Sequence, residues 1–224
     1  MYIKLISNYM KTYSKPTLIA LFILLTGCQS AYYGALEKVG IHKRDVLVSR
    51  VEKAKDSQQE AKEQFKTALE KFKSITQFDG GNLETVYNNL NDEYEESKEL
   101  AGDIRSHISD IENVSDAMFE EWEAELDQYT NQSLRRKSAQ QLANTKRQYN
   151  KLIKTMKNAE KSMDPVLNIF KDQVLYLKHN LNARAIASLK GEISTIESNV
   201  SRLIKQMNSS IDEADRFIQS LNNR

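Results

Sequence analysis

The sequence is poor in the residues that interrupt a helix or cross-link a chain. Its 224 residues include one cysteine, two prolines and seven glycines. A single cysteine cannot form a disulfide within the chain, so disulfide cross-links are not available to this fold. Few prolines and glycines leave few places where a helix must end. The rest of the composition, rich in Ala, Glu, Lys, Leu and Gln, is typical of long helices and coiled coils.

The chain also lacks an excess of charge of either sign. It has 32 Lys and Arg residues and 31 Asp and Glu residues, a formal net charge of +1. Three of the lysines and none of the acids lie in the first 27 residues, which leaves 29 basic and 31 acidic residues in the remainder. Such a balanced surface gives no electrostatic reason to expect a nucleic-acid partner.

The apolar run at residues 18–25 is too short to cross a membrane. It has eight residues, whereas a spanning helix needs about 20. Lys4, Lys11 and Lys15 precede the run and small residues follow it, which is the order of a secretory signal peptide. We therefore predict a cleaved signal peptide at residues 1–27 and regard a permanent transmembrane anchor as the weaker interpretation.

Residues 25–28, Leu-Thr-Gly-Cys, resemble the bacterial lipobox. The resemblance implies that Cys28 is acylated and becomes the first residue of the mature protein, with no free thiol. Each CH₂ of an acyl chain contributes about 0.8 kcal/mol when buried, so two or three chains anchor a protein durably to a membrane. Gln29, rather than Asp, follows the cysteine. This residue implies sorting to the periplasmic face of the outer membrane.

Residues 28–42 are predicted to form a lipidated tether and entry segment. Tyr32, Tyr33 and Leu36 make it more apolar than a free linker, while Gly34 and Gly40 interrupt any helix. We expect a short helical turn that lies on the end of the following domain or at the lipid headgroups, where tyrosine is favoured.

Residues 43–224 are predicted to form one domain, because apolar residues recur there in steps of three and four. This heptad pattern predicts an all-α fold, an elongated antiparallel helical bundle or coiled coil of four or five long helices. The first helix has the seam Leu47, Val51, Ala54, Gln58, Ala61, Phe65, Ala68, Phe72 and Ile75. Three breaks are expected: at residues 79–82, where Asn82 caps the second helix; at residues 130–133, after a seam that reaches Tyr129; and at Asp164-Pro165, a capped restart.

The seam changes register near residues 176–186. The run that includes Leu177 and Leu181 would continue to Arg184 and Ser188, but the apolar residues fall at Ile186 and Leu189 instead. One interpretation is a hinge between two helices, which the asparagines favour. The other is a polar site that contacts a partner. The residues concerned are Tyr176, Lys178, His179, Asn180, Asn182 and Arg184.

Several segments resemble one family of uncharacterised Gram-negative lipoproteins, the domain of unknown function 2959 family. They are residues 33–50, 78–81 (Phe-Asp-Gly-Gly), 119–129, 133–136 (Ser-Leu-Arg-Arg) and 176–186. The resemblance covers essentially all of the mature chain and implies a coiled-coil fold. It implies no mechanism, so no catalytic or ligand residue is transferred from it.

No arrangement of residues in the sequence indicates catalysis, a metal or a cofactor. Asp103, His107 and Asp110 share a helical face, but solvated or capping roles are favoured over metal binding. The acidic run at residues 120–125 is interpreted as carboxylates on either side of Trp122, a core or interface anchor, in preference to a cation site. We therefore expect a protein that is not an enzyme.

Two functional classes remain open. The first is a structural, scaffolding or adaptor protein that binds a protein partner, or itself, through its coiled coil. The alternative is a lipid-engaging or envelope-stress protein whose helices contact membrane or ligand directly. The position of exposed apolar surface separates them: a stripe along the helices suits a protein, and a patch near Cys28 suits lipid.

Overall fold

The computed structural model describes Tyr33, Leu36 and residues 40–75, 80, 82–180 and 182–222, without the side chains of residues 183 and 185. The predicted signal peptide and lipobox lie outside these residues. Two compact units divide the chain, Met1–Val46 and Leu47–Arg224. Four long helices make up nearly all that is described, and no strand occurs in this part of the chain: α3 (Lys43–Ile75), α4 (Leu83–Leu126), α5 (Gln132–His179) and α6 (Ala183–Asn222). The all-α prediction is confirmed, with four long helices among the described residues.

The heptad seam forms the core of the second unit. All nine predicted seam residues of α3 are buried. The seams of α4, α5 and α6 are buried in the same way over most of their length. Phe65 and Phe72 of α3 stack on Phe170 of α5, with ring centroids 6.4 and 4.5 Å apart. All three rings are fully buried, so this stacking joins α3 to α5 inside the core.

Polar contacts between α3 and α6 keep a constant antiparallel register. Lys55 of α3 donates to Asp215 of α6, and Lys62, two helical turns further along α3, donates to Asn208, which lies equally far back along α6. The next contact, between Lys73 and Glu197, again advances along α3 by as much as it retreats along α6. The two helices therefore keep one antiparallel register from Lys55 to Lys73, although they lie at opposite ends of the described sequence.

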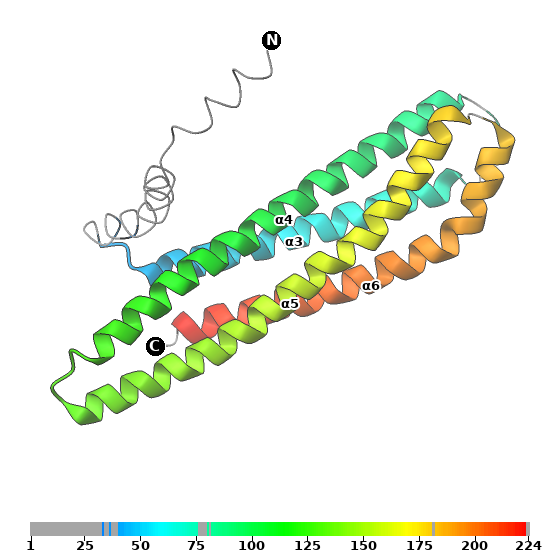
Figure 1. Ribbon diagram of the computed structural model, residues 1–224. Helices are drawn as coiled ribbons and strands as arrows, with labels where there is room; N and C mark the ends of the chain where they lie inside the picture. Colours follow the sequence, from blue (N-terminus) through cyan, green and yellow to red (C-terminus); the bar gives the residue numbers. More distant parts are fainter. Residues whose placement is uncertain are drawn as a thin grey trace, which may run out of the picture. The chain divides into compact units, whose positions relative to one another are not determined.

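Contacts between α4 and α5 show the same regularity. Glu112 pairs with Lys157, and Glu123, three turns further along α4, pairs with Lys146, which lies equally far back along α5. Figure 1 shows these two helices side by side, joined by the short turn at their lower left end.

Among the described helices, none is both long and apolar enough to cross a membrane.

Two predicted boundaries were wrong. Helix α5 continues through Pro165 instead of restarting there. A proline inside a helix costs about 3 kcal/mol, but Met163 and Val166 on either side are buried, and Arg105 of α4 binds Asp164. Packing thus holds the helix together across the proline.

The end of the second helix also differs from the prediction. Helix α4 begins after Asn82, whose side chain accepts a hydrogen bond from the Glu84 amide, as predicted. It ends at Leu126, however, so Tyr129 lies in the turn with 38% of its surface exposed. The reason is local capping: the Arg135 side chain donates to the Leu126 carbonyl, and Asn131 caps α5.

Candidate functional site

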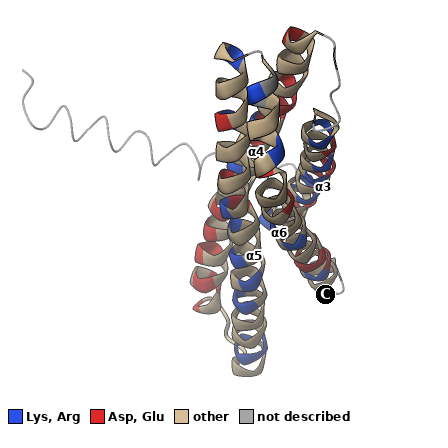
Figure 2. Cartoon of the chain, turned by 90° about the vertical axis from the view of Figure 1, so that its right-hand side faces the viewer, with Lys and Arg blue, Asp and Glu red and all other residues tan. Residues whose placement is uncertain are grey.

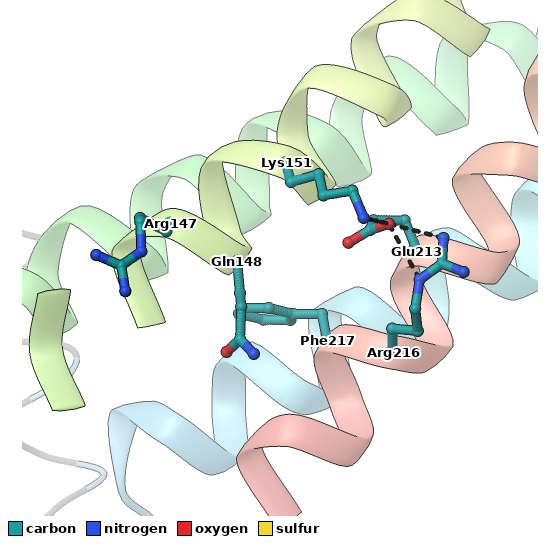
Figure 3. Close-up of a pocket in the computed structure, with 6 residues that line it drawn as sticks. All are labelled: Arg147, Gln148, Lys151, Glu213, Arg216 and Phe217. Carbon is teal, nitrogen blue, oxygen red and sulfur yellow. Dashed lines mark hydrogen bonds and ion pairs between the residues drawn. The ribbon is translucent and has the colours of Figure 1, made fainter. Parts of the chain in front are cut away.

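A buried carboxylate marks the most distinctive polar site in the described part of the chain. Glu213 of α6 is only 5% exposed, and it faces α5. Its Oε2 atom accepts hydrogen bonds from Arg216, at 2.7 Å and 3.1 Å, and pairs with Lys151 Nζ of α5 at 2.8 Å. Figure 3 shows Lys151 and Arg216 reaching this oxygen from opposite sides.

A pocket of about 320 Å³ lies beside this carboxylate. Arg147, Gln148 and Lys151 of α5 line one side, and Glu213, Arg216 and Phe217 of α6 line the other. The Phe217 side chain is buried and gives the pocket an apolar floor. Arg147 points away from the Glu213 cluster in Figure 3, and its guanidinium donates to Asn144 of its own helix.

The electrostatics of the cluster keep Glu213 ionised. Burial raises the pKa of the carboxyl, but the hydrogen bonds from Lys151 and Arg216 outweigh burial and leave the pKa below its ordinary value of 4.5. A carboxylate held in this way is a poor proton donor near neutral pH. The cluster therefore acts as a charged cross-link between α5 and α6.

We expect the Glu213→Gln variant to lose less folding stability than the unmodified chain when the pH is lowered. A carboxyl with a lowered pKa stabilises the fold above its unfolded pKa, and this contribution is lost as the pH falls through the folded pKa. Because the side chains of Lys151 and Arg216 are 63% and 59% exposed, the contribution is about 1 kcal/mol. Thermal melting followed by circular dichroism at pH 7 and at about pH 3 measures it.

The neighbouring variant Asp212→Asn is the control. Asp212 is exposed, and the described residues offer it no ion pair. This variant should lose as much stability on acidification as the unmodified chain. Equal acid sensitivity of Glu213→Gln and the unmodified chain would show that the cluster does not stabilise the fold.

The turn between α4 and α5 forms a second polar and aromatic site. Trp122 is half-buried, and its indole nitrogen donates to Ser138 Oγ at 2.8 Å. Arg135 binds Asp127 at 2.8 Å as well as the end of α4. Of the acidic residues beside Trp122, Glu120 and Glu123 are exposed and Glu121 is half-buried. The interpretation of Trp122 as a core or interface anchor stays a prediction.

The structure places the residues of the register change at a helix boundary. Helix α5 ends at His179 and α6 begins at Ala183. Tyr176, Lys178, His179, Asn182 and Arg184 are exposed and Asn180 is half-buried. Leu181 lies outside the described residues, as does Cys28.

Both asparagines at this boundary bind backbone groups of their own helix ends. The Asn180 side chain donates to the Tyr176 carbonyl at 2.9 Å, and the Asn182 side chain accepts from the Arg184 amide at 3.0 Å. These bonds give a capping reason for two asparagines at this point. The hinge and the contact site stay predictions.

The residues considered for a metal do not converge. Asp110 pairs with Arg50 of α3 at 3.1 Å. Burial, and next the charge of Lys53, lower the pKa of His107. Across the residues that the structure describes, no three His, Cys, Asp or Glu side chains are placed to hold a metal ion.

Sequence reasoning missed the Glu213 cluster. One signal was available: the seam of α6 has a gap between Met207 and Ala214, and Ser210 and Glu213 occupy inward-facing positions there. A glutamate on the buried face of a helix requires a cationic partner. Nothing in the sequence indicated that Lys151, on the preceding helix, is that partner.

The comparisons with known proteins give a family and no mechanism. No curated protein and no solved structure shows significant similarity to this chain. One family model, described as "Protein of unknown function (DUF2959)", matches residues 32–221. This match spans most of the chain, including all the helices α3 to α5 and nearly all of α6. The chain therefore belongs to the DUF2959 family.

Proposed function

We propose that this protein is a lipid-anchored spacer or adaptor on the periplasmic face of the outer membrane. The anchor is Cys28, and the helices that follow it hold a partner protein away from the lipid. The Leu-Thr-Gly-Cys sequence behind a short apolar run supports the anchor. The helices support the spacer.

Helix length is the observation that carries the adaptor role. Helices α4 and α5 contain 44 and 48 residues, so they are roughly 66 and 72 Å long at about 1.5 Å per residue. Their inter-helix polar contacts, such as Glu123–Lys146 and Arg105–Glu160, hold the second half of α4 beside α5. Long paired helices of this kind hold a bound protein at a fixed distance from the membrane anchor.

Exposed apolar side chains at the α4–α5 turn provide a place for a partner. Tyr129 and Leu134 are 38% and 51% exposed. Aromatic and aliphatic residues of this kind anchor protein interfaces. Proximity labelling by an enzyme fused to the C-terminus of the full chain, compared with the same fusion carrying Tyr129→Ser and Leu134→Ser, tests the adaptor role. The two substitutions should remove specific labelled proteins; identical labelling profiles would argue against a partner at this turn.

Substitution of the cysteine tests the anchor. Cys28→Ser should abolish incorporation of radioactive palmitate and leave an unprocessed precursor, because no thiol is available for acylation. Gel mobility and palmitate labelling in growing cells measure both effects. The matched control is Ser30→Ala, which should be labelled and processed normally. Normal cleavage and release of the Cys28→Ser protein would contradict the lipid anchor.

Membrane fractionation tests the location separately. Gln29 after the cysteine leads us to expect the mature protein in the outer-membrane fraction. Recovery mainly with inner membrane would remove this part of the proposal and leave the anchor itself intact.

A direct lipid-engaging role is the second candidate, and Ile41 is the observation that favours it. This side chain is 42% exposed and belongs to the entry segment that follows Cys28 in the sequence. Photo-activated lipid analogues would label a peptide that contains Ile41 if the entry segment lies in the headgroup region. Labelling that is confined to the peptide with the acylated Cys28 would support the adaptor role without direct lipid contact by the helices.

A further inference from the structure

Charge is separated between the two helices of the α4–α5 hairpin. Residues 106–134 contain eight Asp and Glu residues and no Lys or Arg. Residues 128–159 contain eight Lys and Arg residues and no Asp or Glu. The blue bands that follow one another along the lower part of α5 in Figure 2 belong to this basic segment. The second half of α4 is thus acidic, and the first half of α5 is basic.

Pairing within the hairpin uses only part of this charge. Glu112, Glu123 and Asp127 of the acidic segment pair with bases of α5. Asp116 and Glu120 are exposed, and the described residues give them no ion pair. Arg136, Arg147 and Lys154 of α5 are exposed in the same way, without an ion pair in the described part of the chain.

These five residues lie on the outward sides of α4 and α5. The two acids are one helical turn apart. Arg136 and Arg147 are separated by about three turns, and Arg147 and Lys154 by about two. Each set therefore falls on one side of its helix. The buried residues Met118 of α4, and Tyr149 and Leu152 of α5, lie on the opposite, core-facing sides. We call Asp116, Glu120, Arg136, Arg147 and Lys154 the hairpin outer face.

Acids and bases on this face occur at matching heights. The pairs Glu112–Lys157 and Glu123–Lys146 fix which residues of α4 and α5 lie level with each other. By that register, Asp116 and Glu120 lie level with the part of α5 between Arg147 and Lys154. Arg147 and Lys154 therefore lie beside the acidic strip at its own height, and the basic strip continues toward the turn as Arg136.

We propose that the hairpin outer face binds the same face of a second copy of this chain. A surface with an acidic strip beside a basic strip is its own complement when rotated by half a turn about an axis parallel to the hairpin. That rotation places α4 of each copy against α5 of the other, with both turns at the same end. Such a two-fold, isologous contact is the commonest form of protein association.

The chemistry of the face predicts a salt-sensitive contact. Exposed charges attract across an interface mainly at low ionic strength, and the range of the attraction falls from about 30 Å at 0.01 M salt to about 3 Å at 1 M. Copies of the chain should therefore associate in dilute buffer and separate when salt is added.

Charge reversal in two tagged copies of the full chain tests the proposal. The α4-reversed protein carries Asp116→Lys and Glu120→Lys, and the α5-reversed protein carries Arg147→Glu and Lys154→Glu. Each is produced with either of two affinity tags, solubilised in a non-ionic detergent and mixed at low and high salt. The fraction of one tag that co-purifies with the other is measured.

The expected pattern has three parts. Unmodified copies co-purify at low salt, whereas each reversed protein loses at least about tenfold of its self-association, because its two strips then have the same sign. A mixture of the α4-reversed and α5-reversed proteins restores co-purification, since one hairpin is then basic and the other acidic. A protein with all four substitutions associates with itself again.

Two controls separate this contact from other causes. Arg202→Glu and Lys205→Glu, exposed residues of α6, change the net charge as much as the α5 reversal does and should leave self-association unchanged. Circular dichroism should show equal helix content in every variant, because exposed residues tolerate substitution with little loss of stability.

Two results would overturn the proposal. One is that unmodified copies fail to co-purify at low salt, or that all variants co-purify to the same extent. The other is an increase in sedimentation when phosphatidylglycerol is added to phosphatidylcholine vesicles, if only the α5 reversal removes this increase and the unmodified chain does not self-associate. The second result would assign the basic strip to an anionic lipid surface instead.

Discussion

Phe170→Ala should lower the unfolding free energy by about 3 to 5 kcal/mol, the range for removal of a fully buried aromatic ring. The Phe170 side chain has no exposed surface and lies 4.5 Å from Phe72, centroid to centroid, with the planes 9° from parallel. Its removal leaves a cavity and deprives both Phe72 and Phe65 of a stacking partner. The midpoint of thermal unfolding should fall on the order of 10 °C for a chain of this size.

Leu175→Ala is the matched control for this substitution. Leu175 lies further along α5 and is 49% exposed, so its truncation should change stability by less than about 0.5 kcal/mol. Circular dichroism of the helix signal during urea and thermal unfolding measures both variants. If Phe170→Ala and Leu175→Ala melt together, Phe170 is not packed between α3 and α5.

Gln58→Met should raise the unfolding free energy by about 1 to 3 kcal/mol, the cost of a buried polar group without a hydrogen bond. Gln58 has no exposed surface, and neither its amide nitrogen nor its amide oxygen has a hydrogen-bond partner among the described residues. The hydroxyls of two other buried side chains, Ser97 of α4 and Ser210 of α6, also lack a hydrogen-bond partner among the described residues. Methionine matches the length of glutamine and removes both polar atoms, so the core loses an unpaired amide and keeps its volume.

Gln140→Met provides the comparison for Gln58→Met. Gln140 is exposed on α5, where the same change removes no buried polar atom and should shift stability by less than about 0.5 kcal/mol. Chemical unfolding of the two variants beside the unmodified chain measures the difference. A loss of stability in Gln58→Met would mean that the amide is hydrogen-bonded inside the bundle, for example to a buried water.

The sequence predicted the core well because helix burial repeats with a fixed period. Every seam residue assigned to α3 is buried, including Gln58, which the period placed inside despite its polarity. Periodicity failed where tertiary contacts override a local signal. Pro165 signals a helix start, yet α5 passes through it. Tyr129 fits the seam, yet Arg135 binds the end of α4 before it and Asn131 caps the start of α5 after it.

The polar site was harder to predict than the core. Glu213 was detectable as an acid on a buried face, but Lys151 belongs to another helix and is one of nine basic residues between residues 135 and 161. Which of these lysines and arginines meets Glu213 depends on how α5 is rotated and shifted against α6. Heptad spacing alone leaves both quantities open.

The pairing of α3 with α6 has a consequence for the order of folding. Lys55 and Asp215 are 160 residues apart, whereas Glu123 and Lys146 are 23 apart. Closing a long loop costs more entropy than closing a short one, so local helix hairpins form before distant segments meet. The α4–α5 hairpin is therefore an early structure, and the contacts between α3 and α6 form last. Until α6 docks, the side of α3 that it covers is open to a chaperone or a protease.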